Sequence, residues 1–281
     1  MKQVIFHVMS AVIALVLILS SCSKVDWKIL KDKHGWKFLI PDCDVQRVYT
    51  QGAGSSINVQ MQKTFYPDGR TKKIGFYTYS GTSEDVFWHS FSLHYNVGSR
   101  TVDIIDSARG AAVLKAIFNP SGRLERLERL QGDTSVFGDY IFEYVNGRLD
   151  RINQESFTYD SNGNIVRREI YNAAAGHAVQ GSIYTFGVAA TDKRQFYIPQ
   201  YNYMIVIDPS MALIEYLRWI KDFSPKNILT RIEYVAPLPQ EETFSAHVFD
   251  ADGKLTSYSL GGQWGDSVGS TKYIEWTCSA Y

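Results

Sequence analysis

One short pattern recurs five times in this 281-residue chain and constrains its fold more than any other feature. Each copy has an aromatic residue, a few turn-forming residues and a glycine, and a basic or polar residue then leads into the next apolar segment. Glycine accepts positive φ, and Asn, Asp and Pro favour turns, so each copy predicts a tight reversal between two strands. The copies lie at 65–70, 118–124, 142–149, 157–171 and 249–255. Hairpins repeated in this way predict a long antiparallel meander.

The composition agrees with a mainly β fold. The chain has 18 Tyr and 15 Phe but only 8 Pro, which favours pleated, half-buried surfaces. A dozen or more strands rarely remain a flat open sheet, so we expect the meander to curl into an open or closed barrel-like sheet. Lys plus Arg and Asp plus Glu are equal at 29 each, so no nucleic-acid partner is expected.

The first 21 residues are typical of a removable signal peptide. An apolar core from 8 to 19 is too short to span a bilayer, and small residues precede Cys22. The Leu-Ser-Ser-Cys sequence that ends at Cys22 resembles the lipobox of bacterial lipoproteins, which implies that Cys22 is the lipid attachment site. An ordinary secretory signal is the alternative. We expect a signal peptide at 1–21, a tether at 22–35 and a single β-hairpin-repeat domain at 36–281.

The residues after Cys22 bear on location. Ser23 stands where the enteric retention signal for the inner membrane has Asp, so the outer membrane is the expected location, with the chain lipid-anchored there. Lipoproteins exported to the cell surface usually carry an acidic cluster here, whereas this chain has only Asp26, so the periplasmic and the surface face both stay open. The strands mix polar residues into both faces, so a transmembrane porin is not expected.

Two segments could be helical. Between 209 and 222, apolar residues recur at helical spacing, from Pro209 near the start to the Ser224-Pro225 stop, and this predicts the one helix. The segment 123–130 places leucines three apart, which also fits a helix. Because it begins directly at a repeat turn, we interpret 123–130 as a strand.

These features together resemble an uncharacterised family, a domain of unknown function, of bacterial lipoproteins with a porin-like fold. The hairpin cadence is similar to the YD repeats of large secreted β proteins. The resemblance rests on the lipobox, the Gly-Arg-Leu turns and the segment 223–229 after the helix, and it covers nearly all of the mature chain. It implies a long antiparallel sheet curled into an open or closed barrel, with the helix against the concave side. Some members are described as calcium binders, but no activity is established, so no catalytic residue carries over.

Cys43 and Cys278 lie near the two ends of the mature chain, in a compartment that permits disulfides. A bridge would join the first strand region to the last, and two buried free thiols are the alternative. The sequence contains neither Cys-x-x-Cys nor His-x-x-x-His spacing, so we expect no metal site.

No catalytic motif withstands inspection. The segment 265–269 matches Gly-x-Ser-x-Gly, but a nucleophile elbow needs a following helix and a downstream histidine, and the last histidine is His247. We interpret the segment as a Gly-rich turn. His89 and His94 are separated by an odd interval, so they point to opposite faces of one strand. We therefore expect no enzyme.

Calcium is the one cofactor that the turns suggest. Asp160, Asn162 and Asn164 place oxygen atoms at alternate positions, as do Asp250 and Asp252. An EF-hand loop needs glycine at its sixth position and Glu at its twelfth, and neither requirement is met here. Turn capping explains these residues, so we expect no cofactor, with calcium as the alternative.

Aromatic residues supply the candidate binding surface. Most aromatic side chains in β proteins pack in the core, but exposed ones could form flat platforms for a ligand. The candidates are Trp88, Tyr201, Tyr203, Trp264, Tyr273 and Trp276. The expected function is a lipid-anchored, non-enzymatic cell-envelope module that binds a glycan, peptide or protein partner. The alternatives are a structural component of an outer-membrane assembly and a glycan hydrolase.

Overall fold

The computed structural model describes residues 43–51, 57–78, 86–96, 98–130, 139–172, 177–189, 194–197, 209–236, 240–262 and 270–278. The predicted signal peptide, the predicted tether and the first residues of the predicted domain lie outside these ranges. The predicted domain bounds therefore stay predictions.

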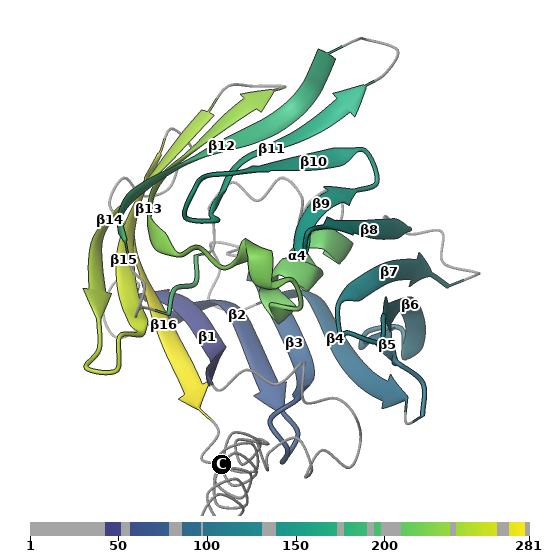
Figure 1. The fold of residues 1–281 in the computed structure, drawn as a ribbon. Coiled ribbons are helices and arrows are strands. Elements are labelled where there is room, and N and C mark those ends of the chain that lie inside the picture. The colour runs from purple at the N-terminus through teal and green to yellow at the C-terminus, as the bar shows by residue number, and fades with distance from the viewer. Residues whose placement is uncertain are drawn as a thin grey trace, which may run out of the picture. The chain divides into compact units, whose positions relative to one another are not determined.

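Sixteen strands in the described part of the chain form one closed antiparallel barrel (Figure 1). They are β1 Cys43–Gln51, β2 Ile57–Phe65, β3 Thr71–Thr78, β4 Val86–Asn96, β5 Thr101–Asp106, β6 Ala111–Phe118, β7 Leu124–Arg129, β8 Tyr140–Val145, β9 Arg148–Ile152, β10 Glu155–Tyr159, β11 Ile165–Asn172, β12 His177–Ala189, β13 Asn227–Ala236, β14 Gln240–Phe249, β15 Leu255–Gly262 and β16 Ser270–Cys278. Each strand pairs with its neighbours in sequence, and β1 also pairs with β16. The expected barrel is confirmed, and its sheet is closed.

The seam between β1 and β16 closes the barrel. Its register runs from Cys43 opposite Cys278 to Thr50 opposite Lys272. Cys43 and Cys278, which are 235 residues apart in sequence, have Cα atoms 4.0 Å apart and are joined by a disulfide. Of the two alternatives for these cysteines, the structure therefore has the bridge.

Four of the five predicted turns share one backbone geometry. The N–H of the first residue donates to the carbonyl four residues later, and its own carbonyl accepts the N–H of the glycine three residues later. These turns are 66–70, 119–123, 160–164 and 250–254, and their glycines have φ between 76° and 86°. The fifth is a two-residue turn in which Asn146 and Gly147 have φ of 50° and 83°. All five predicted reversals are confirmed.

A tyrosine from a later strand contacts three of these turns in the same way. Its hydroxyl donates to the carbonyl of the residue that follows the arginine of the hairpin repeat, and that arginine lies over its ring. These contacts tie each hairpin to a neighbour. The hydroxyl bonds run from Tyr95 to Thr71 at 3.0 Å, from Tyr144 to Leu124 at 3.0 Å and from Tyr159 to Leu149 at 2.7 Å. The arginines are Arg70, Arg123 and Arg148, with guanidinium-to-centroid distances of 4.6, 5.3 and 5.4 Å.

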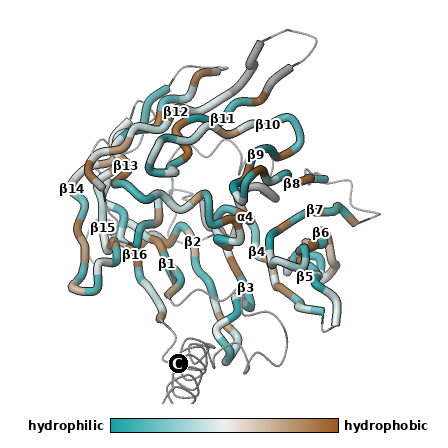
Figure 2. The backbone as a smooth tube through the Cα atoms, in the orientation of Figure 1, coloured by the Kyte–Doolittle hydropathy of each residue, from teal (hydrophilic) through white to brown (hydrophobic). Residues whose placement is uncertain are grey.

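The inner face of the barrel is largely apolar. Buried side chains such as Met61, Ile74, Leu114 and Tyr258 alternate along the strands with side chains that face outward. Figure 2 shows the same alternation as brown and teal segments along single strands. Polar residues also occur among the buried positions of the strands, including Asp44, Lys63, Glu242 and Lys272, so both faces carry polar residues as expected.

Polar residues form rows across the outer wall, one strand after another. One row joins Glu275, Arg47, Gln62 and Ser90 across β16 and β1–β4 through Gly75. A second joins His94, Asp103, Lys115 and Glu128 across β4–β7. A third joins Glu143, Arg151, Ser156 and Glu169 across β8–β11. Further outward ion pairs join Arg231 to Glu233 and Glu241 on β13 and β14.

The segment 123–130 is strand β7, as predicted, with Leu124 and Leu127 buried. The predicted helix begins at Pro209 as expected, but α4 (Pro209–Leu217) ends earlier than residue 222. Arg218 has a φ of 56°, a left-handed conformation that terminates the helix. A 3-10 turn, η3 (Lys221–Phe223), follows. No helix within the described ranges has the length and hydropathy to cross a membrane.

Candidate functional site

Two described parts of the connection between β12 and β13 contact the inner side of the barrel wall. These parts, 194–197 and 209–226, are called the plug here. In Figure 1 the helix α4 lies within the ring of strands. Aromatic contacts join the plug to three parts of the wall. They are Tyr216 of α4 to Phe76 on β3, Trp219 to Phe118 on β6 and Phe223 to Phe157 on β10, with centroids 5.2, 5.2 and 5.8 Å apart. The family resemblance implied a helix against the concave side of the sheet. The structure has this helix on the concave side, where it fills part of the barrel interior.

Asn164, at the end of a repeat turn, fixes the last part of the plug. Its side-chain oxygen accepts the N–H groups of Lys226 at 2.7 Å and Asn227 at 3.1 Å, and its amide nitrogen donates to the Asn227 side chain at 3.0 Å. Gln195 donates to the Asn227 carbonyl at 3.2 Å, and Tyr197 donates to Gln195 at 2.6 Å. The Lys-Asn segment after the helix therefore serves to dock the plug onto the β10–β11 turn.

A cavity of about 120 Å³ remains between the plug and the β11–β13 wall. Its polar lining includes Arg168, Tyr184, Gln195, Glu215 and Asp222, and the rest is mainly aromatic and aliphatic. A water molecule occupies about 30 Å³ in the liquid, so the cavity has room for a few waters or one small group. Pockets for drug-sized ligands usually measure about 300–1,000 Å³.

Arg168 is the main charged group of this cavity. Its guanidinium donates to Glu155 on β10 at 2.8 Å and to Glu215 on α4 at 2.5 Å, and its side chain is 12% exposed. Burial disfavours the charge, but the two carboxylates outweigh burial and raise the pKa of Arg168 well above its usual value. Burial raises the pKa of the neighbouring Tyr184. Glu215 thus holds the plug to the wall through Arg168, and Asp222, the other carboxylate of the lining, accepts the backbone N–H of Leu149 at 3.2 Å.

A second buried polar group lies on the inner face of β13–β16. Lys272 is 3% exposed, and burial lowers its pKa to about 8 against the opposing attraction of Glu242. Glu242 is buried and accepts a hydrogen bond from Tyr234 at 3.4 Å. Gln240 is also buried, and its two amide atoms have no hydrogen-bond partner within the described residues. An amine with a pKa near 8 is partly neutral at physiological pH. Burial also lowers the pKa of Lys63, the other buried lysine of the described interior, against the attraction of Asp44.

The structure describes only part of the predicted site. The lipid attachment residue Cys22 and the aromatic candidates Tyr201, Tyr203 and Trp264 lie outside the described residues, as does the Gly-x-Ser-x-Gly segment. Trp88 belongs to β4, but the position of its side chain is outside the description. The roles predicted for these residues stay predictions.

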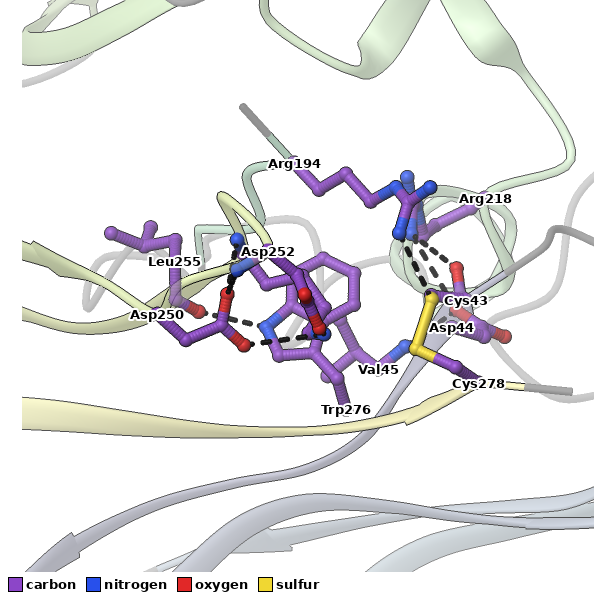
Figure 3. Close-up of a disulfide and its surroundings, with 11 residues drawn as sticks. Cys43, Asp44, Val45, Arg194, Arg218, Asp250, Asp252, Leu255, Trp276 and Cys278 are labelled. Carbon is purple, nitrogen blue, oxygen red and sulfur yellow. Dashed lines mark hydrogen bonds and ion pairs between the residues drawn. A yellow bond between two sulfur atoms is a disulfide. The ribbon is translucent and has the colours of Figure 1, made fainter. Parts of the chain in front are cut away.

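Tyr273 and Trp276 lie on β16 but do not share a face. Tyr273 stacks on Tyr49 at the outer wall, with centroids 5.4 Å apart. Trp276 points inward, donates to the Leu255 carbonyl at 2.7 Å and carries Arg218 over its ring at 5.5 Å (Figure 3). Their spacing of three residues could have indicated opposite faces from the sequence alone.

The candidate calcium ligands are used within their own turns. Asp160 accepts the backbone N–H of Asn164 at 2.8 Å and its side-chain N–H at 2.8 Å, and against burial these bonds lower the pKa of Asp160. Asp250 accepts the N–H groups of Asp252 and Lys254 in the same way. Within the described ranges, no group of three His, Cys, Asp or Glu residues is placed to hold a metal. Calcium binding stays untested.

Comparisons with known proteins add two similar folds. No protein-family model matches the chain, and no curated protein matches it either. The chain is similar to the crystal structure of a porin-like protein from Bacteroides uniformis, at 13% identity over 84% of this chain and 98% of that one, with a TM-score of 0.48. It is also similar to a porin-like protein from Bacteroides vulgatus, at 10% identity over 82% and 97% of the two chains, with a TM-score of 0.44.

Proposed function

We propose that this chain is a non-enzymatic barrel of the cell envelope, held at the outer membrane by lipid on Cys22 and surrounded by water rather than by lipid. The observation that carries the proposal is the outer wall, whose polar rows cross β16 and β1–β11. An Arg or Lys side chain facing lipid near the bilayer midplane costs about 2–4 kcal/mol, and Asp or Glu costs less. A wall with this many charges is more stable in water, so attachment to the membrane needs an anchor.

The filled interior argues against a channel or a large internal binding site. Among the described residues, the plug contacts the wall at β3, β6, β10 and β11, and the cavity between the plug and the β11–β13 wall measures about 120 Å³. Of the two carboxylates that line this cavity, Glu215 is paired with Arg168 and Asp222 accepts the backbone N–H of Leu149. Both are thus engaged in contacts between the plug and the wall, which argues against a free general acid or base here. A glycan, peptide or protein partner therefore meets the outer wall or a rim.

An aromatic patch at the barrel seam is the best candidate for that contact. Tyr49 and Tyr273 stack across β1 and β16, Arg47 lies 5.1 Å from the Tyr49 centroid, and Arg47 pairs with Glu275. Stacked tyrosines bordered by charges supply flat apolar area together with hydrogen-bonding groups, a combination common at binding surfaces. We call these four residues the seam patch.

Binding to the seam patch is tested by a glycan, polysaccharide and peptide screen on the mature protein, with and without calcium. Saturable binding that Tyr273→Ala weakens at least tenfold, and that the outward neighbour Thr271→Ala leaves unchanged, would support the proposal. Equal binding by both variants would remove the patch from the proposal. If no glycan or peptide binds, chemical cross-linking in intact cells separates a protein partner from a component of a larger assembly.

The lipid anchor is tested separately by growing cells with an alkyne-labelled fatty acid. The wild-type chain and Ser23→Ala should incorporate the label, and Cys22→Ser should not. Equal labelling of Cys22→Ser would contradict attachment at this cysteine.

A further inference from the structure

The disulfide that closes the barrel has two unlike sulfur environments. Cys43 is 7% exposed and lies against the plug, whereas Cys278 is exposed. In Figure 3 the Arg194 side chain approaches the Cys43 sulfur, Arg218 approaches the Cys43 carbonyl and Asp44, and the Cys278 sulfur lies on the other side of the Cys43 sulfur. An incoming thiol would therefore reach Cys278 more easily than Cys43.

Cationic groups surround the buried sulfur. Arg194 of the plug places Nη1 3.0 Å from the Cys43 Sγ, and Arg218 places Nη1 3.5 Å from the Cys43 carbonyl oxygen. The nearest described carboxylate, Asp44, binds the Lys63 amine with both oxygens at 2.9 Å and lies 3.9 Å from Arg218. Three positive charges thus face one negative charge beside Cys43.

The groups on neighbouring elements do not offset this excess. The carboxylates of Asp250 and Asp252 at the β14–β15 turn are already paired with Lys254 of the same turn. Burial lowers the pKa of Arg218, and the charge of Arg194 adds to this effect against the attraction of Asp44. An additional negative charge at the Cys43 sulfur would be stabilised in these surroundings.

We propose that the Cys43–Cys278 disulfide is a site of thiol–disulfide exchange with a dithiol reductant, with Cys278 as the attacked sulfur and Cys43 as the leaving thiolate. The thiolate of the reductant forms a bond to the Cys278 Sγ. The Cys43–Cys278 bond breaks, and its electron pair stays on the Cys43 Sγ, where Arg194 stabilises the charge. The second thiolate of the reductant then attacks the mixed disulfide and releases Cys278. The chain gains two electrons, and the dithiol is oxidised to a disulfide.

The direction of exchange follows from two general properties of this reaction. The rate rises when the leaving thiol has a low pKa, and it depends on which sulfur is accessible. Arginine beside a cysteine lowers the thiol pKa, and an exposed sulfur admits the attacking group. Here both properties favour attack at the Cys278 sulfur with Cys43 as the leaving thiolate. A disulfide that served only to hold β1 and β16 together would need neither Arg194 beside Cys43 nor an exposed Cys278.

The test uses the folded, full-length protein and reduced glutathione as the probe. After acid quenching and alkylation, peptide mass spectrometry locates the mixed disulfide. We expect glutathione on Cys278 and a free, alkylated Cys43 without any denaturant. Glutathione on Cys43, an even distribution, or reduction only after unfolding would overturn the proposal.

Variants separate the charge at the sulfur from the stability of the seam. Arg194→Gln should slow the exchange by about tenfold, because the leaving thiolate loses its partner. Arg194→Lys should restore most of the rate. Arg47→Gln is the matched control, since Arg47 bridges the same two strands through Glu275 but does not contact the sulfur. If Arg47→Gln slows the exchange as much as Arg194→Gln, or if neither changes it, the role of Arg194 is wrong.

Discussion

The hydroxyl of Tyr144 donates a 3.0 Å hydrogen bond to the carbonyl oxygen of Leu124, twenty residues earlier in the chain. Equivalent bonds join Tyr95 to Thr71 and Tyr159 to Leu149. In each case the acceptor is the carbonyl of the residue that follows the arginine of a hairpin repeat. The sequence repeat therefore encodes contacts between neighbouring hairpins as well as the turns themselves.

Removing one of these hydroxyls should destabilise the barrel without altering its fold. Tyr144→Phe leaves the Leu124 carbonyl without its partner and should lower the free energy of unfolding by about 1 kcal/mol. Urea unfolding monitored by circular dichroism measures the change. Tyr273→Phe on the outer wall is the control and should cost less. An equal or smaller loss for Tyr144→Phe would show that the contact is not stabilising.

Adjacent arginines on β11 should differ sharply in their contribution to stability. Arg168→Met leaves Glu155 and Glu215 buried without their cation, which typically costs about 3–5 kcal/mol. Arg167→Met removes an outer pair with Glu169 in which Arg167 is 48% exposed, and it should cost at most about 1 kcal/mol.

The buried ion pairs can be distinguished from simple loss of packing. Adding Glu155→Gln and Glu215→Gln to Arg168→Met removes the unpaired charges and should recover much of the lost stability, as measured by urea unfolding. If the triple variant is no more stable than Arg168→Met, the loss does not come from the uncompensated carboxylates.

Stability should depend on pH through Lys272. Its pKa is about 8 in the folded chain and about 10.4 for an unperturbed lysine. Below about pH 8 both states carry the proton, and the folded state bears the full cost of the buried charge. As the pH rises from 8 toward 10.4, only the unfolded state remains protonated, so the free energy of unfolding increases by up to about 3 kcal/mol.

Lys272→Met should reduce this increase, and Lys115→Met on the outer wall should retain it. The part that remains in Lys272→Met is assigned to Lys63, whose pKa is also lowered by burial. Urea unfolding between pH 7 and 9.5 is the measurement. It stops there because burial raises the pKa of tyrosines such as Tyr144, and their unfolded-state ionisation weakens stability at higher pH. A flat profile for the wild-type chain would contradict the assignment of a low pKa to Lys272.

Local sequence signals predicted much of the fold. Positive-φ glycines and turn-forming neighbours mark the hairpins, and period-two alternation marks the strands, because both depend on residues close together in the chain. Strand β7 was resolved from a helix only by the turn before it. The end of α4 at Leu217 was missed, since apolar spacing continues past Arg218 to Ile220, and nothing local specified the left-handed conformation there.

The interior site depends on contacts that no local pattern contains. Arg167 and Arg168 are indistinguishable in sequence, and only the register with β10 and the position of α4 brings Arg168 between Glu155 and Glu215. Closure of the sheet likewise joins β1 to β16 across the whole chain. Of the seam patch, the sequence pointed only to Tyr273. Its stacking partner Tyr49 lies 224 residues away in the chain, so no local pattern joins the two.

The most direct test of a water-facing barrel is to express residues 36–281 without the anchor and examine them in detergent-free buffer. Sedimentation velocity and far-ultraviolet circular dichroism should show a soluble, folded β protein that unfolds cooperatively in urea. Addition of detergent micelles should change neither result. A chain that precipitates or stays unfolded in water and folds only with detergent or lipid would contradict the account, because its outer wall would then require a membrane.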